Sequence, residues 1–119
     1  MAEVLKLESI SKRYGRTQAL LDVSLTVGAG EVFGVLGPNG SGKTTMLSIV
    51  LGAMRQSHGS FRWFGQEPTC GARRRIGALL ELPAFYPWLS GLRNLKIMAA
   101  IKRIPEIDAE APLRTVGLW

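Results

Sequence analysis

Cysteine, histidine and long apolar runs are all scarce in this sequence of 119 residues. The single cysteine, Cys70, excludes an internal disulfide and, without a Cys or His companion nearby, a structural zinc site. The single histidine, His58, lies in a turn-like polar stretch and is expected to be a solvated loop residue. Apolar runs fall far short of the roughly 18 residues that span a bilayer, and the N-terminus has no signal-peptide form. We therefore expect no transmembrane segment in this chain and a cytoplasmic location.

Acidic residues are also few, because 9 Asp and Glu stand against 15 Lys and Arg, for a net charge of +6. Such an excess can indicate a nucleic-acid or acidic-membrane partner. Much of it lies in the single run Arg73 to Arg75, so we expect no nucleic-acid partner. An apolar content of 46% against 20% charged residues predicts a folded chain, and the length allows one domain or part of one.

The stretch from Gly37 to Thr44 has the G-x-x-x-x-G-K-[ST] spacing of a phosphate-binding loop. A β-favouring apolar run precedes it and a run without Gly or Pro follows it, which predicts a strand, a loop and a helix in succession. Glycines let the backbone curl until successive N–H groups point at a phosphate, with the positive end of the helix dipole behind them. The predicted nucleotide-binding residues of this loop are Gly37, Asn39, Gly40, Ser41, Gly42, Lys43, Thr44 and Thr45.

Side chains at the end of the loop have separate predicted roles with a nucleoside triphosphate and Mg²⁺. Lys43 supplies a positive charge for the β- and γ-phosphates, which makes it a catalytic candidate, and Thr44 offers its hydroxyl to Mg²⁺. Thr45 can donate a hydrogen bond on the α-phosphate side. The alternative, a glycine-rich turn that binds nothing, leaves the lysine directly after the glycines unexplained.

Hydrophobic periodicity predicts the remaining elements. Near the N-terminus it suits an antiparallel pair of strands with one wet face, with the odd-numbered residues from Leu21 to Val27 on one face and Asp22 on the other. Ser90 is the predicted N-cap of a later helix that Pro105 stops. The predicted strands cover residues 4–9, 19–27, 31–36, 60–64 and 75–80, and the predicted helices cover 46–51, 90–104 and 106–116, the last with a break at Pro112.

Taken in order, these features resemble the nucleotide-binding domain of ATP-binding cassette (ABC) proteins over essentially the whole chain. An aromatic residue before the second strand, the Gly37–Thr45 loop, a strand ending in Gly65 and the segment from Glu81 to Leu95 carry the resemblance. It implies an α/β fold with a P-loop NTPase core, an N-terminal antiparallel β-subdomain and the start of a helical subdomain. The expected division of this single partial domain is a β-rich subdomain and P-loop core in residues 1–80, followed by a Q-loop-like segment and the start of the helical subdomain in 81–119.

The resemblance also implies roles for aromatic residues. It assigns Tyr14 as the ring on which adenine stacks, so ATP is the expected nucleotide. The alternative is a tyrosine that caps the end of the first hairpin. Phe85, Tyr86 and Trp88 have two interpretations as well: a surface that packs against a helix of a membrane subunit, or the core of a small helical subdomain.

Glu81 stands where the family normally has a glutamine that links Mg²⁺ and the attacking water to the transmembrane partner. A carboxylate can still bind Mg²⁺ through a water, so Glu81 joins Lys43 as a catalytic candidate and Thr44 as a candidate metal ligand. The alternative is a solvated loop carboxylate. The stretch from Glu81 to Gly91 resembles ATPases of ABC-2-type exporters, which implies export of a drug, peptide or lipid-like substrate.

Further family motifs do not occur in the sequence: the Leu-Ser-Gly-Gly-Gln signature, the Walker B Asp-Glu pair and the switch histidine. Leu89-Ser90-Gly91 lacks the following Gly-Gln, and the apolar run ending at Asp22 precedes the phosphate loop. We therefore expect an N-terminal fragment that binds MgATP and hydrolyses little or none of it, from a protein that hydrolyses ATP when intact.

The resemblance implies partners for the intact protein. Two such domains, as a homodimer or a paired cassette, would enclose two ATP molecules and drive a transmembrane permease from the inner face of the membrane. Two alternatives remain: a soluble ABC-type ATPase that acts on nucleic acid or ribosomes, and a non-hydrolysing nucleotide-binding module.

Overall fold

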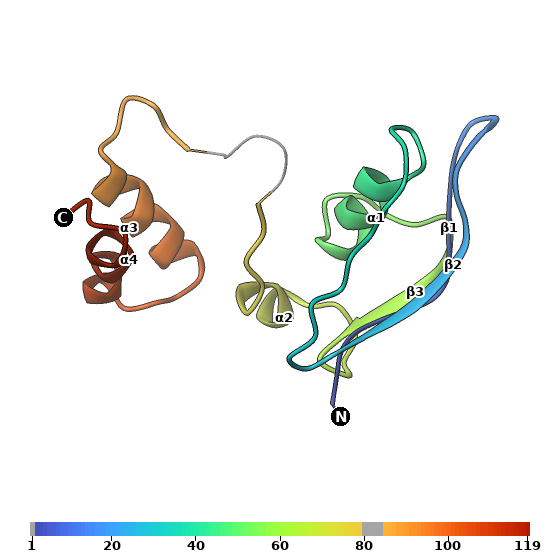
Figure 1. Cartoon of the computed structure of the whole chain (residues 1–119), viewed down its shortest axis with the longest axis horizontal. Helices are drawn as coiled ribbons and strands as arrows, with labels where there is room; N and C mark the ends of the chain where they lie inside the picture. Colours follow the sequence, from blue (N-terminus) through green and yellow to red (C-terminus); the bar gives the residue numbers. More distant parts are fainter. Residues whose placement is uncertain (1, 80–84) are drawn as a thin grey trace. The chain divides into compact units, whose positions relative to one another are not determined.

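The computed structural model describes residues 2–79 and 85–119 and divides the chain into two compact units, Met1–Arg73 and Arg74–Trp119. The first unit contains a sheet with a helix against it, and the second contains short helices (Figure 1). The division predicted at residue 80 stays a prediction, because residues 80–84 lie outside the described part of the chain.

A three-stranded antiparallel sheet forms the framework of the first unit. Strands β1 (Glu3–Tyr14) and β2 (Thr17–Gly28) form a hairpin, and β3 (His58–Trp63) pairs with the other edge of β1, which gives the order β2-β1-β3. Leu7 in the middle strand lies opposite Leu25 of β2 and Phe61 of β3. The strands predicted at residues 4–9, 19–27 and 60–64 are confirmed in place.

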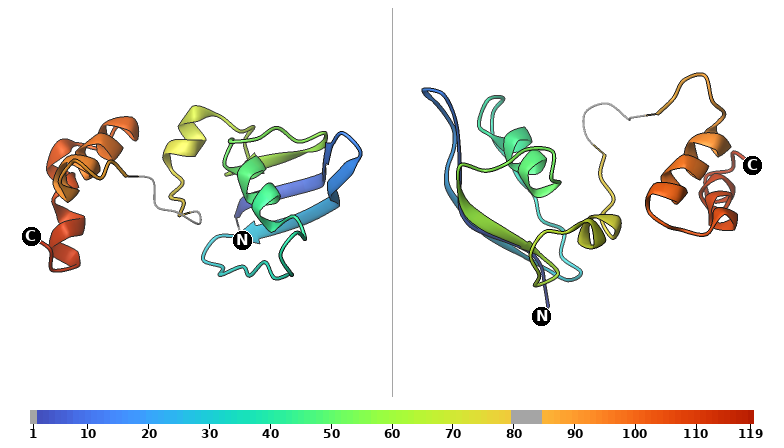
Figure 2. Two further views of the ribbon diagram at one scale, coloured as in Figure 1. Left: turned by 90° about the horizontal axis from the view of Figure 1, so that it is seen from above. Right: turned by 180° about the vertical axis from the view of Figure 1, so that it is seen from behind.

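Helix α1 (Lys43–Val50) packs on one face of the sheet and completes the core (Figure 2). A helix of this length is marginal in isolation, so its stability comes from the apolar face that it buries. The indole N–H of Trp63 donates to the carbonyl oxygen of Val50 at 2.7 Å and joins β3 to the end of the helix. The buried core consists of Leu7, Ile10, Leu20, Met46, Ile49, Val50 and Phe61.

Two bulges of the hairpin, one in each strand, lie on either side of the Ile10–Val23 pair. Ser9 and Asp22 both have left-handed backbone conformations, with φ of 52° and 50°. The amide of Ser9 donates to the hydroxyl of Ser24 at 2.8 Å, and the amide of Asp22 donates to the hydroxyl of Ser11 at 2.9 Å. Each bulged amide is thereby paired with a serine of the neighbouring strand, which removes the cost of an unsatisfied donor.

These bulges change which residues of β2 face the core. The predicted alternation is wrong at Leu21, which is 73% exposed, while its neighbour Leu20 is buried. The register shifts between Ile10 and Lys12 account for the change, because one extra residue moves every following side chain to the other face. Asp22 is exposed, as predicted.

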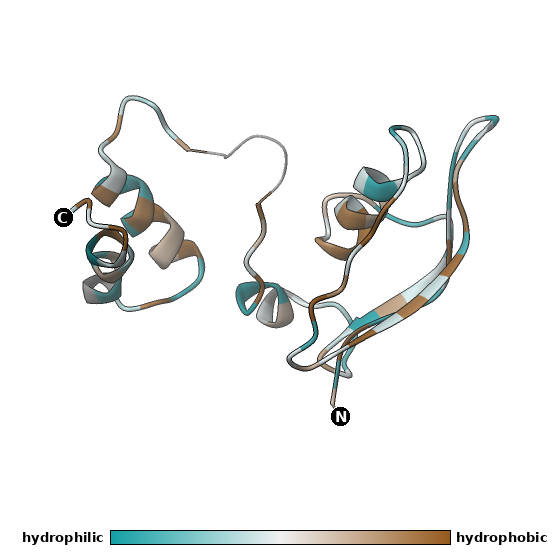
Figure 3. Ribbon diagram, viewed as in Figure 1, coloured by the Kyte–Doolittle hydropathy of each residue, from teal (hydrophilic) through white to brown (hydrophobic). Residues whose placement is uncertain are grey.

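Residues 31–36 differ most from the predicted strand. Within the described part of the chain they have no regular secondary structure and pair with no strand. The ribbon of this apolar segment is largely brown in Figure 3, and Val32 and Leu36 in it are almost fully exposed. A strand that is apolar on both faces needs strands on either side and covering layers on both faces. The three described strands pair with one another in the antiparallel sheet β2-β1-β3 and do not flank residues 31–36.

The strand predicted over residues 75–80 is also wrong for its described residues. Helix α2 (Cys70–Arg74) comes directly before them, and residues 76–79 have no regular structure. The side-chain amine of Lys102 donates to the carbonyl oxygens of Ile76 and, at 3.4 Å, Arg74. These backbone groups therefore bind a side chain in place of a neighbouring strand.

The second unit contains the helix predicted after Ser90. Helix α3 (Gly91–Ile101) is followed by the 3-10 turn η1 (Glu106–Ala109) and by α4 (Ala111–Thr115), which replace the single helix predicted over 106–116. Pro112 lies in the first turn of α4, where its missing N–H costs little, so the break falls before it. No helix in residues 2–79 and 85–119 combines the length and apolarity that crossing a membrane requires.

Candidate functional site

The loop that leads into α1 takes its shape from two glycines with positive φ, Gly40 at 84° and Gly42 at 98°. Residues with a side chain rarely adopt such angles. Gly42 also has no room for a side chain, because a Cβ there would lie 2.6 Å from the carbonyl oxygen of Ala19 and 2.7 Å from a methyl carbon of Leu20. Glycine at this position therefore lets α1 begin directly against β2.

The start of α1 presents backbone donors that the helix does not use. Its first turn is closed by a hydrogen bond from the amide of Met46 to the carbonyl oxygen of Gly42 at 2.9 Å. The amides of Lys43, Thr44 and Thr45 precede this bond, so they have no acceptor within the helix. Gly42 has no side chain with which to cap them. Together with the positive end of the helix dipole, they form an anion-binding position.

Lys43 places its charge over the same loop. Its side-chain amine donates to the carbonyl oxygen of Gly37 and approaches that of Pro38 at 3.5 Å. These carbonyl oxygens hold the ammonium group beside the loop. A phosphate oxygen is the stronger partner for an ammonium group, because its negative charge adds a Coulombic attraction that a neutral carbonyl oxygen lacks.

The tip of the loop is a turn in which the amide of Ser41 donates to the carbonyl oxygen of Pro38 at 3.1 Å. Asn39 and Gly40 lie exposed at this tip. A Cβ on Gly37 would lie 2.7 Å from the hydroxyl oxygen of Ser41, so the two ends of the turn are in close contact. The structure thus brings the loop residues predicted from the motif into one short segment, with the hydroxyl-bearing Thr44 exposed at the helix start.

Tyr14 lies at the end of β1, beside the segment that follows α1. Its hydroxyl donates to the sulfur of Met54 at 2.6 Å, and the amine of Lys12 lies 5.2 Å from the ring centroid. The side chain is 45% exposed. Figures 1 and 2 show the hairpin end and the loop before α1 toward the same end of the first unit. Both predicted interpretations, adenine stacking and hairpin capping, are compatible with this position.

Glu81, the predicted catalytic and metal-binding carboxylate, lies outside the described residues, so its role stays a prediction. The aromatic residues that follow it are described: Phe85, Tyr86 and Trp88 are 59%, 46% and 77% exposed. The rings of Tyr86 and Trp88 lie 5.3 Å apart, and the side chain of Asn94 bonds to both the amide and the carbonyl of Tyr86. In the described part of the second unit these three aromatic residues therefore lie on the surface and are not buried in a core.

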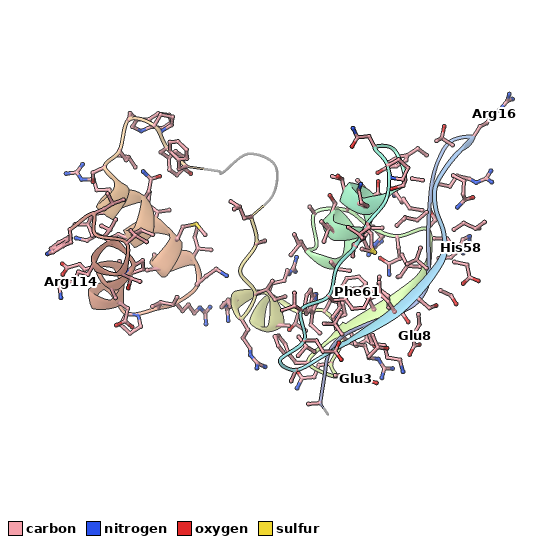
Figure 4. All side chains as sticks on the ribbon, in the orientation of Figure 1. Glu3, Glu8, Arg16, His58, Phe61 and Arg114 are labelled. Carbon is pink, nitrogen blue, oxygen red and sulfur yellow. The ribbon has the colours of Figure 1, made fainter. Side chains whose placement is uncertain are left out.

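A cavity beside the loop was not predicted from the sequence. Its volume is about 340 Å³, and its walls come from β2, residues 33–36, the loop and the start of α1. Apolar side chains such as Leu25, Phe33 and Met46 contribute to it, so its chemistry differs from that of the phosphate position. The apolar run 31–36 was the available signal, but its periodicity suggested a strand. His58, predicted in a loop, begins β3 and is exposed (Figure 4).

Open helix-start amides beside a lysine on a glycine-rich loop are the phosphate-binding arrangement of P-loop NTPases, and the first unit is of this class. Comparison with known proteins narrows the class. The chain belongs to the ABC transporter family, whose model matches residues 20–118. The family resemblance carried by the sequence motifs is thereby confirmed.

Relatives in the same family share sequence along almost the whole chain. The ABC transporter ATP-binding protein YdbJ of Bacillus subtilis (strain 168) is 40% identical over 123 residues, which cover 99% of this chain and 40% of that protein. The bacitracin transport ATP-binding protein BcrA of Enterococcus faecalis is 34% identical over 122 residues, with the same two coverages. The chain therefore spans about 40% of the length of these relatives.

Solved structures agree with the fold. The ATP-binding subunit of an ABC transporter superposes with a TM-score of 0.85 at 27% identity, covering 97% of this chain and 51% of that one. The ADP conformation of MJ1267, an ATP-binding cassette of an ABC transporter, gives a TM-score of 0.56 at 35% identity over 58% of this chain and 27% of that one. The predicted α/β fold class is confirmed, although residues 31–36 form no strand within the described part of the chain.

Proposed function

We propose that this chain binds ATP with Mg²⁺ through the loop Gly37–Thr45, as part of the ATP-binding subunit of a transporter. The main support is the ammonium group of Lys43, which the carbonyl oxygens of Gly37 and Pro38 hold beside the unused amides at the start of α1. A positive charge and helix-start donors that share one loop suit a phosphate chain.

Each part of the loop has its own task in binding. The amides of Lys43, Thr44 and Thr45 donate to phosphate oxygens, while the lysine amine exchanges its backbone partners for oxygens of the β- and γ-phosphates. The exposed hydroxyl of Thr44 is available as a ligand for Mg²⁺. When bound, Mg²⁺ neutralises charge that develops on the phosphate oxygens during transfer. Tyr14 would receive the adenine ring, and Glu81 would contribute its carboxylate to holding the metal.

Hydrolysis and transport belong to the whole protein. The 119 residues contain neither the Leu-Ser-Gly-Gly-Gln signature nor an Asp-Glu pair after an apolar run. We therefore expect this stretch alone to hydrolyse little ATP. Relatives of the chain include a lantibiotic transport ATP-binding protein, SrtF of Streptococcus pyogenes, and the bacitracin transport ATP-binding protein BcrA. By analogy, the whole protein pairs with a second cassette, works with a membrane permease on the inner face of the membrane and exports its substrate.

Calorimetric titration with MgATP tests the binding site. Replacing Lys43 by alanine removes the one side-chain charge on the loop, so we expect affinity to fall by about 100-fold or more. Lys6→Ala is the matched control, because Lys6 lies on β1 and pairs with Glu8 at 3.2 Å in an exposed ion pair. That variant should bind MgATP like the wild type. Equal affinity of wild type and Lys43→Ala would contradict the proposed function.

A further inference from the structure

The side chain of Tyr14 forms a hydrogen bond and a cation–π contact that the family resemblance does not predict. Its hydroxyl donates to the sulfur of Met54, and the amine of Lys12 lies over its ring at 5.2 Å from the centroid. A cation within about 6 Å of an aromatic centroid is attracted to the face of the ring. The Lys12 amine therefore contacts one face of the Tyr14 ring, and the hydroxyl forms a hydrogen bond to the segment after α1.

Lys12 is itself held in place. Its amine donates to the carbonyl oxygen of Arg55 at 2.7 Å, so the cation over the ring does not swing freely with its long side chain. Two further bonds join the same strand to the same segment: the amide of Ser57 donates to the carbonyl oxygen of Ser11 at 2.8 Å, and the amide of Arg13 donates to the hydroxyl of Ser57 at 3.0 Å. Residues 54–57 thus form a strap that connects the end of α1 to the end of β1.

Resting on the proposed function, we infer that Lys12 and Met54 are positioning residues for the base of the bound nucleotide. Lys12 occupies one face of Tyr14, a residue that is 45% exposed, and the proposal assigns the purine to the opposite face of the ring. Met54 fixes the rotation of the ring through its hydroxyl. A ring that is already oriented loses less conformational freedom on binding than a mobile one. Because the strap begins just after α1, the same helix that starts at the phosphates carries the support for the base at its other end.

A comparison of two ligands separates base contacts from phosphate contacts. Calorimetry on the natural full-length chain measures the dissociation constants for MgATP and for magnesium tripolyphosphate, which lacks the nucleoside. We expect Lys12→Ala to weaken MgATP binding about threefold and to leave tripolyphosphate binding unchanged. Lys12→Arg, which keeps a cation over the ring, should restore the wild-type ratio. Arg16→Ala is the control, because Arg16 is a cation at the tip of the same hairpin (Figure 4).

A second pair of variants tests the hydroxyl contact. Met54→Leu keeps the volume and removes the sulfur acceptor, and Tyr14→Phe keeps the ring and removes the donor. Each should weaken MgATP about twofold, and the double variant should be no weaker than either one, since all three lose the same contact.

The outcomes distinguish this inference from the function on which it rests. If Lys12→Ala leaves the ratio of the two dissociation constants unchanged, whether both affinities stay the same or both fall equally, the positioning role is overturned. If Lys43→Ala also binds MgATP like the wild type, the binding site itself has been misassigned. If Lys43→Ala loses binding while the Lys12→Ala ratio stays constant, only the positioning role fails.

Discussion

Helices α1 and α3 begin in opposite ways. The N-cap of α3 is Ser90, whose hydroxyl accepts a hydrogen bond from the amide of Arg93 at 3.2 Å. The N-cap of α1 is Gly42, with φ of 98° and no side chain to offer. The amides at the start of α3 are thus partly satisfied by a side chain, whereas those at the start of α1 have no side-chain cap, and we propose that a ligand binds them. One residue position decides whether a helix start serves stability or binding.

The residue after each cap sharpens the contrast. Lys43 occupies the first position of α1, where a positive charge opposes the helix dipole and lowers helix stability by some tenths of a kcal/mol. No acidic residue offsets it in that turn of the described helix. A lysine in this position is unfavourable for helix stability, which supports the proposal that an anion binds there.

The largest effect is expected from adding a methyl group to the cap of α1. Gly42→Ala puts a Cβ against the carbonyl oxygen of Ala19, a backbone atom that cannot move aside, and does so at a positive φ. We expect the free energy of unfolding of the first unit to fall by about 3 kcal/mol and MgATP binding to be lost. Urea unfolding monitored by far-UV circular dichroism measures the first change and calorimetry the second.

Gly15→Ala is the control for the backbone angle alone. Gly15 also has a positive φ, 54°, but a Cβ there would meet no atom within 4 Å. Its cost should be about 1 kcal/mol, with MgATP binding retained. If Gly15→Ala and Gly42→Ala destabilised equally, the close contact between α1 and β2 would carry no weight in the comparison of the two helix starts.

The next effect comes from filling the open helix start with ligand. At an MgATP concentration 100 times the dissociation constant, the first unit should gain about 2.7 kcal/mol of stability. Amide hydrogen exchange resolves the two helices, so protection should rise in α1 and β2 and stay unchanged in α3, whose cap is internal. An equal increase in protection of α1 and α3 on adding MgATP would show that the contrast between their N-termini has no consequence for binding.

Local patterns predicted the elements whose partners lie within the described chain. The hairpin, the phosphate loop and the Ser90 cap depend on neighbours close in sequence or on one turn of backbone, so periodicity and motif spacing were sufficient. Strand β3 pairs with the distant β1, but the alternation within its own residues was enough to identify it. Among the predicted site residues, the loop Gly37–Thr45 leads into α1 and Tyr14 lies at the hairpin end, while their nucleotide-binding roles stay predictions. Glu81 stays a prediction because the described residues do not include it.

Elements that depend on distant partners were not predictable in this way. The run 31–36 has the composition of a buried strand, but composition does not say which strands lie beside it. The burial of Leu20 in place of Leu21 depends on paired bulges, and these depend on the hydroxyls of Ser11 and Ser24 across the hairpin. The contact of Lys12 with the ring of Tyr14 likewise requires the strap from Met54 to Ser57, which no local pattern reveals.

The smallest effect tests the closed helix start. Ser90→Ala removes the hydroxyl that accepts from the amide of Arg93, so the second unit should lose about 1 kcal/mol of stability. Faster hydrogen exchange in the first turn of α3 measures the loss, and Ser90→Asp, which keeps a side-chain acceptor, should prevent it. MgATP affinity should be unchanged in both variants, because α3 lies in the unit that does not contain the loop. A loss of MgATP affinity in Ser90→Ala with normal affinity in Ser90→Asp would mean that this cap also supports the nucleotide site, and the separation of roles between the two helices would be wrong.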